Sequence, residues 1–113
     1  MGELIGKGLV ASGAGCEGVI RRASAIPEVV ALMKATDLGE TILLTDSASA
    51  TAVGPLLPKV RGLICLSGGL TSHLAIVSRE FGLPAVMSAE IDDPDSLDGV
   101  RVTIGEDGTI SRA

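Results

Sequence analysis

The residue types around one histidine of this chain would suit the transfer of a phosphoryl group. His73 is the only histidine, and it follows the glycines Gly68 and Gly69 and the hydroxyl residues Thr71 and Ser72. Glycines permit a tight backbone turn, and Thr and Ser are residue types that cap the N-terminus of a helix. The spacing therefore predicts that His73 lies in the first turn of a helix that begins behind a glycine turn.

The N-terminus of a helix favours anions. Its first N–H groups have no partners within the helix, and the helix dipole places partial positive charge there. A histidine in this place is disfavoured as a cation, so its neutral and nucleophilic form is favoured. Once a phosphoryl group is attached to the ring, the N–H groups and the hydroxyls of Thr71 and Ser72 could hold its oxygens. From the residues alone, a phosphate carrier and an ordinary surface histidine remain equally open.

The flanking residues predict the elements that position this helix. The apolar run 62–66 before the glycines indicates a buried strand. Beyond the histidine, Leu74, Val77 and Phe81 can share one face of a helix. Gly82, with a proline two residues later, is a typical end of a helix.

Arg79 lies six residues after His73, about 240° further round the helix. It therefore falls well off the face that carries the histidine. For this arginine we favour a structural salt bridge or a contact with a docking partner over direct binding of phosphate.

The stretch 68–86 resembles the signature of the mobile, swivelling phosphohistidine domain of phosphoenolpyruvate-utilising enzymes. This family includes pyruvate phosphate dikinase, phosphoenolpyruvate synthase and rifampicin phosphotransferase. The residues that match are Gly68, Gly69, Thr71, Ser72, His73, Ala75, Ile76, Arg79, Gly82, Pro84, Ala85 and Val86. The resemblance implies that His73 becomes phosphorylated, and that the two glycines and two hydroxyl residues before it cradle or position the phosphate.

The start of the chain predicts two strands, over 4–10 and 19–23. The glycine-rich stretch 11–18 between them lacks the Lys-Ser/Thr ending of a phosphate-binding loop. It also lies between strands and not before a helix, so we expect a structural hairpin there.

The remaining pattern indicates an α/β domain with about seven short strands in a mixed sheet and two or three helices. Further strands are expected over 41–45, 62–66, 84–87, 100–104 and 109–111. Helices are expected over 27–35, over 51–60 in a short or broken form, and after Ser72. The carboxylates within 90–95 favour a solvated acidic loop over a metal site, and 105–108 indicates a hairpin turn.

Length and resemblance give the domain organisation. At 113 residues the chain is expected to be a single domain, residues 1–113. The resemblance implies a swivelling β/β/α fold, a rigid body that carries the histidine between two distant active sites. Because the chain starts with Met1 and shows no linker, we expect a free-standing subunit.

Composition argues against several other functions. A net charge of −5 and the absence of Trp and Tyr offer nucleic acid neither a basic surface nor stacking platforms. No apolar run approaches the roughly 20 residues of a membrane span, and no signal peptide is recognisable. The two cysteines are too few and too far apart in the sequence for a metal cluster. A cytoplasmic protein without nucleic-acid or membrane partners is therefore expected.

The resemblance implies a dikinase-type phosphotransferase that is active only with partner domains or subunits. An ATP-grasp partner would phosphorylate His73 from ATP, and an acceptor-binding partner would present a small molecule to the phosphohistidine. We expect ATP and Mg²⁺ at the partner, with no cofactor and no metal bound by this chain itself.

Other functions stay open at this point. The donor could be phosphoenolpyruvate, as in the carriers of phosphotransferase systems, although the long glycine-rich start makes this less favoured. The domain could instead be a non-catalytic regulatory module that binds an anion at the helix N-terminus. A hydrolase with Ser72 or Ser12 as nucleophile is disfavoured, because no Gly-x-Ser-x-Gly elbow is present.

Overall fold

The computed structural model describes residues 3–13, 15–22, 26–34, 38–45, 58–66, 73–91 and 94–113. Its elements, in chain order, are β1 (Leu4–Ser12), β2 (Cys16–Arg22), α1 (Ile26–Lys34), β3 (Thr41–Thr45), β4 (Gly62–Cys65), α3 (His73–Phe81), β5 (Ala85–Ile91), the 3-10 helix η3 (Pro94–Leu97), β6 (Arg101–Ile104) and β7 (Thr109–Arg112).

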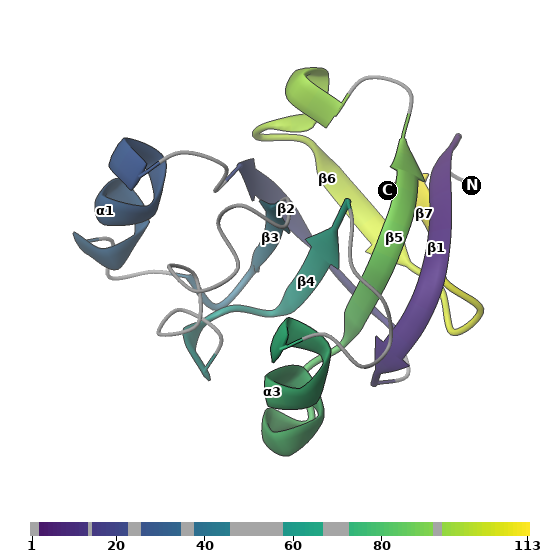
Figure 1. The fold of residues 1–113 in the computed structure, drawn as a ribbon. Helices are drawn as coiled ribbons and strands as arrows, with labels where there is room; N and C mark the ends of the chain where they lie inside the picture. Colours follow the sequence, from purple (N-terminus) through teal and green to yellow (C-terminus); the bar gives the residue numbers. More distant parts are fainter. Residues whose placement is uncertain are drawn as a thin grey trace.

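The described strands form a closed barrel in the order β1-β5-β4-β3-β2-β6-β7, which β7 closes by pairing with β1 (Figure 1). The neighbours β2–β3, β3–β4 and β4–β5 are parallel. The remaining four pairs are antiparallel. The expected α/β class with a mixed sheet and few helices is thereby confirmed, and closure into a barrel is a feature that the sequence did not predict.

Strands β3 and β4, which have parallel neighbours on both sides, are buried along their whole length, as expected for strands of a parallel sheet with both faces covered. In β3, Leu43 belongs to one hydrophobic cluster, while its neighbours Ile42 and Leu44 belong to another. The second cluster draws on strands around the whole barrel and therefore fills its interior: Ile20, Ile42, Leu44, Ile64, Val86, Ala89, Leu97, Val102, Ile104 and Ile110. The first lies on the outer face of β3, β4 and β5, beneath the helices.

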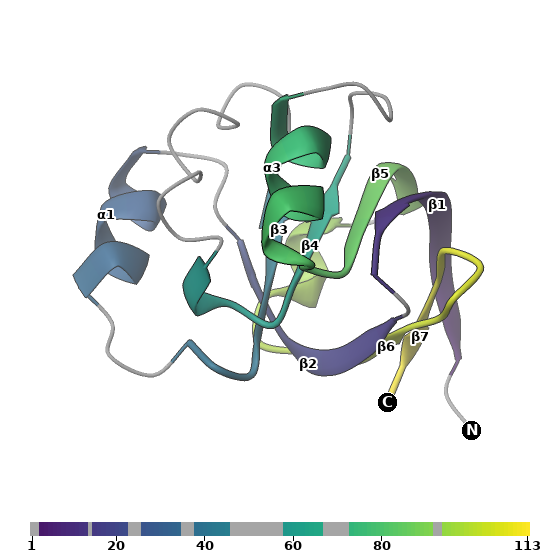
Figure 2. The ribbon, with the colours of Figure 1, turned by 90° about the horizontal axis from the view of Figure 1, so that it is seen from below.

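Helix α3 covers this outer face and contacts β1 and β5 (Figure 2). Among residues 75–81 of this helix, Ala75 and Ser78 are fully buried, and their small side chains allow the helix to approach the strands closely. Phe81 is 53% exposed. The expected apolar face through Val77 and Phe81 is therefore wrong at Phe81, while Val77 is partly buried against the outer cluster.

The expected hairpin between the first two strands is also wrong. Both strands exist, but β1 pairs with β5 and β7, and β2 pairs with β3 and β6. The turn between them carries the chain across the barrel. Gly13 and Gly15 have φ of 79° and 101°, and a Cβ on them would stand 2.5 Å from the Cα of Pro84 and from the carbonyl oxygen of Ile104, respectively.

The second half of the chain follows the prediction more closely. β6 and β7 form the expected hairpin through the turn 105–108. β5 extends to Ile91, so Glu90 lies in a strand and not in the expected acidic loop. The strand continues past Ser88 through a bulge. Ser88 has a φ of 50°, and β5 has one residue more than β1 between the register partners on either side of it.

Helix α1 matches the expected helix, and its Leu32 packs against the outer cluster. Of the helix expected over 51–60, residues 51–57 lie outside the described part, and Pro58 and Lys59 form a short 3-10 turn. None of the helices in the described segments has the length and apolar character needed to cross a membrane.

Candidate functional site

His73 is the first residue of α3, as its position behind the two glycines predicts. The helix connects β4 to β5, which are parallel neighbours, so it runs back along the sheet and begins beside the carboxyl end of β4 (Figure 2). In α/β folds, ligands bind at the carboxyl ends of parallel strands. The structure therefore places the start of α3 at the edge where this rule locates a site.

The carboxyl ends of β3 and β4 are held together at that edge. The N–H of Leu66, just after β4, donates to the carbonyl of Thr45, the last residue of β3, at 2.9 Å. Gly68, Gly69, Thr71 and Ser72 follow and lie outside the described residues, so their expected contact with phosphate stays a prediction.

The charges along α3 leave its N-terminus attractive to an anion. The helix, which is described over its whole length, has no acidic residue in its first turn and carries Arg79 in its last turn. An acid in the first turn would offset the partial positive charge of the dipole. Partial positive charge at the start of a helix is what attracts an oxyanion such as phosphate.

Arg79 makes a contact that the sequence did not reveal. Its Nε donates a hydrogen bond of 2.9 Å to the carbonyl oxygen of Ala11, 68 residues away at the end of β1. A main-chain carbonyl takes part, so no residue type marks this acceptor in the sequence. A role of Arg79 in docking stays a prediction.

The end of α3 matches the sequence. Gly82 has a φ of 64°, and its N–H donates to the carbonyl of Arg79 at 3.2 Å. The N–H of Leu83 donates to the carbonyl of Ser78 at 2.9 Å. These bonds satisfy carbonyls of the last turn and direct the buried Leu83 toward β5.

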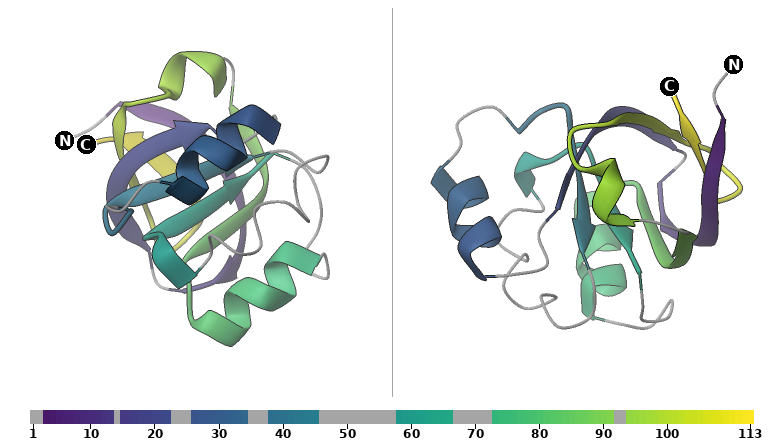
Figure 3. Two further views of the ribbon diagram at one scale, coloured as in Figure 1. Left: turned by 90° about the vertical axis from the view of Figure 1, so that its left-hand side faces the viewer. Right: turned by 90° about the horizontal axis from the view of Figure 1, so that it is seen from above.

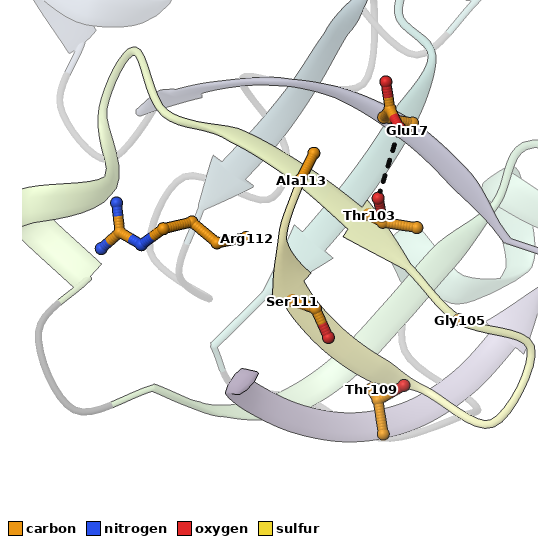
Figure 4. A pocket seen from close by; sticks show the side chains of 7 residues that line it. All are labelled: Glu17, Thr103, Gly105, Thr109, Ser111, Arg112 and Ala113. Atoms are coloured by element: carbon orange, nitrogen blue, oxygen red, sulfur yellow. Dashed lines mark hydrogen bonds between the residues drawn. The ribbon is translucent and has the colours of Figure 1, made fainter. Parts of the chain in front are cut away.

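One hollow of about 410 Å³ lies over the β6–β7 hairpin (Figure 4). Its lining is Glu17, Thr103, Gly105, Thr109, Ser111, Arg112 and Ala113. The Thr103 hydroxyl donates to Glu17 at 3.5 Å, and the Glu17 carboxylate also pairs with Arg101 at 3.3 Å. Among the motif residues whose side chains the structure describes, none lines this hollow, and no feature of the sequence singled it out.

The described cysteines and carboxylates form no metal centre. No group of three His, Cys, Asp or Glu residues in the described segments is close enough to hold an ion. Burial raises the pKa of the Cys16 thiol, and the charge of Arg61 opposes the rise. The expectation that Mg²⁺ and ATP bind at a partner stays a prediction.

The comparisons with known proteins agree with the motif. Residues 38–108 match the sequence model of the family described as PEP-utilising enzyme, mobile domain. The rifampicin phosphotransferase of Bacillus subtilis is 35% identical over 83 residues, which are 73% of this chain and 10% of that protein. A probable phosphoenolpyruvate synthase of Archaeoglobus fulgidus is 30% identical over 110 residues, which are 96% of this chain and 14% of that protein.

A solved structure shares the fold at low sequence identity. The aconitase X of Thermococcus kodakaraensis superposes with a TM-score of 0.66 over 96% of this chain and 97% of that chain, at 14% identity. At this identity the likeness concerns the fold alone. The family match, in contrast, covers more than half of the sequence and includes His73, and this chain therefore belongs to the family of PEP-utilising enzyme mobile domains.

Proposed function

We propose that this chain is the phosphocarrier of an ATP-dependent, dikinase-type phosphotransferase, and that His73 carries the phosphoryl group. The observation that carries the proposal is the position of the sole histidine. It is the first residue of α3, at the carboxyl edge of parallel strands, and it lies inside the region that matches the family of PEP-utilising enzyme mobile domains.

The helix start supplies both functions that a carrier needs. The helix dipole disfavours the imidazolium form, so a neutral ring nitrogen is available to attack the phosphorus. An N–P bond forms while the P–O bond of the donor breaks. The first-turn N–H groups, with the hydroxyls of Thr71 and Ser72, would then hold the phosphoryl oxygens. In the second half-reaction an acceptor oxygen attacks the phosphorus, and the N–P bond breaks.

The donor and the acceptor belong to partners. An ATP-grasp partner would transfer a phosphoryl group from ATP, with water consumed and AMP and inorganic phosphate released. Such transfers depend on positioning and charge stabilisation, so Mg²⁺ is expected at the partner with the nucleotide. The chain spans only 10% and 14% of the two relatives, and the acceptor of this protein is a small molecule still to be identified.

The arrangement of the chain ends supports a swivelling role. Leu4 of β1 is the register partner of Ser111 of β7, and the N–H of Arg112 donates to the carbonyl of Glu3 at 2.7 Å. The two ends therefore leave the barrel beside each other, away from α3 (Figure 3). This arrangement leaves α3 unobstructed, as a body that presents this helix to two centres in turn, like the swivelling β/β/α domain, requires.

The proposal is tested by intact-mass measurement after incubation with ATP, Mg²⁺ and the ATP-grasp partner. Alkaline pH is kept throughout, because phosphohistidine is labile in acid. We expect a gain of one phosphoryl group in the wild-type protein and none in His73→Ala, with circular dichroism showing that the variant is folded.

Three results would redirect or end the proposal. A gain with phosphoenolpyruvate and its enzyme, but not with ATP, would assign the other donor. A gain that persists in His73→Ala would reject His73 as the carrier. No gain with either donor would favour the anion-binding regulatory module.

A further inference from the structure

The C-terminal half of α3 is fastened to the barrel by Arg79. The Nε of this residue donates to the carbonyl oxygen of Ala11 at 2.9 Å, in a partly buried contact. Ala11 is only 8% exposed and belongs to the outer hydrophobic cluster. The acceptor therefore lies at a strand end that is packed against the barrel.

A second contact holds the same junction. Gly13, in the turn after β1, lies so close to Pro84, in the segment after α3, that a Cβ on Gly13 would stand 2.5 Å from the Pro84 Cα. Ser12 and Ala85 are register partners where β1 meets β5. The end of β1 thus contacts both the last turn of α3 and the chain that leaves it.

The contacts of Arg79 affect the position of His73, because a helix tilts as one body and a rotation about its last turn displaces its first turn. Six residues separate Arg79 from His73, which is about 9 Å along the axis at 1.5 Å per residue. A tilt of roughly 6° about Arg79 would move the start of α3 by about 1 Å over that length. A displacement of this size at a reacting group can slow a reaction by about 100-fold.

We propose that Arg79 is a positioning residue, whose Nε bond to the Ala11 carbonyl sets the angle at which α3 presents His73. This inference rests on the proposed phosphocarrier function. The bond acts through the helix and does not touch the phosphoryl group, consistent with the place of Arg79 about 240° round the helix from His73.

Three substitutions separate positioning from charge-based docking. Arg79→Gln removes the charge but keeps an N–H donor, because its Nε2 lies at the same number of bonds from the main chain as the arginine Nε. Arg79→Lys keeps the charge but has a methylene group in place of the arginine Nε. Arg79→Met removes both the charge and the N–H donor. Arg101→Met is the matched control, since it removes an exposed arginine of β6 that forms an ion pair with Glu17 of β2.

The first readout needs no reaction. Residual dipolar couplings of the α3 amides in the free chain report the angle of the helix to the barrel. We expect Arg79→Met and Arg79→Lys to change these couplings, and Arg79→Gln and Arg101→Met to preserve them. Couplings that stay the same in Arg79→Met would overturn the proposal, whether or not the protein proves to be a phosphocarrier.

The second readout is the single-turnover rate of phosphorylation of the chain at saturating partner. We expect Arg79→Met and Arg79→Lys to be slower by about 10- to 100-fold, with Arg79→Gln close to wild type and the half-saturating partner concentration unchanged. A wild-type rate in Arg79→Lys but not in Arg79→Gln, together with a raised half-saturating partner concentration in Arg79→Gln, would overturn the positioning role. It would show instead that the charge of Arg79 docks the partner. No phosphorylation of the wild type would reject the proposed function, while the couplings would still decide the role of Arg79.

Discussion

Gly8 and Gly108 meet where the barrel closes. The N–H of Gly8, within β1, donates to the carbonyl of Gly108 at 3.0 Å, and a Cβ on Gly108 would collide with the Gly8 carbonyl oxygen. Gly108 also has a φ of 88°, which side chains disfavour. The turn between β6 and β7 therefore rests on β1 through a contact that only a glycine permits.

Gly108→Ala is expected to lower the free energy of unfolding by about 2–4 kcal/mol, because backbone strain and a steric clash act together. Gly99→Ala is the first control, since its φ is 83° but no atom of the described residues lies within 4 Å of its Cβ position, and we expect a loss of about 1 kcal/mol. Gly39 has no positive φ, and no described atom lies within 4 Å of its Cβ position, so Gly39→Ala should change stability by less than about 0.5 kcal/mol. Denaturant unfolding measures all three, and equal losses in Gly108→Ala and Gly39→Ala would contradict the contact.

The turn at 105–108 was predictable and its contact with Gly8 was not. Turn residues act through their own backbone angles, so a local pattern reveals them. Strand pairing joins residues far apart in the chain, and a turn pattern does not say which strands pair. The glycines at 13 and 15 therefore indicated a turn correctly, while the inference that β1 and β2 pair across it was wrong.

Phe81 shows the same limit for a helix. The sequence places it on an apolar face, but the buried side of α3 is set by the close approach of Ala75 and Ser78 to the barrel. We expect Phe81→Ala to reduce the free energy of unfolding by less than about 1 kcal/mol, as for other exposed positions. Leu44→Ala removes a fully buried side chain and should cost about 2–5 kcal/mol. A larger loss for Phe81→Ala than for Leu44→Ala would show that Phe81 is buried in solution.

The candidate site also combines features that the sequence predicts with one that it does not. The signals for the start of α3 and for its end at Gly82 are local, and the structure has both where the sequence predicts them. The partner of Arg79 is a carbonyl 68 residues away, which carries no sequence signal of its own. Only the three-dimensional contact between α3 and β1 reveals it.

Asp107 should titrate below the usual range for aspartate. The Thr109 hydroxyl donates to its carboxylate at 2.7 Å and the Thr109 N–H at 3.2 Å, and these bonds lower the pKa of Asp107. Because the pKa is lower in the folded state, the contribution to stability is present above the unfolded value of about 3.9. It is lost as the pH falls through the folded pKa.

Thr109→Val removes the hydroxyl donor and should raise the pKa of Asp107, whereas Thr109→Ser keeps the donor and should leave it low. Carbon-13 NMR of the side-chain carboxyl measures the titration directly. An unchanged pKa in Thr109→Val would show that the hydroxyl is not the main cause of the shift.

Cys16 should react slowly with alkylating reagents at neutral pH, because burial raises the pKa of its thiol and keeps it protonated. Arg61 opposes this rise through its positive charge, so Arg61→Gln should raise the pKa further and slow alkylation. The folded pKa exceeds the unfolded one, so the contribution of Cys16 to stability is full below about pH 8.5. It is lost as the pH rises through the folded pKa.

The rate of alkylation by iodoacetamide as a function of pH measures the Cys16 pKa in a Cys65→Ala background, where one thiol remains. Arg101→Gln is the control, since it removes a positive charge that is paired with Glu17. We expect the rate profile to move to higher pH in Arg61→Gln and to stay in place in the control. A profile that moves equally in both variants would assign the effect to net charge, and faster alkylation in Arg61→Gln would contradict the electrostatic role of Arg61.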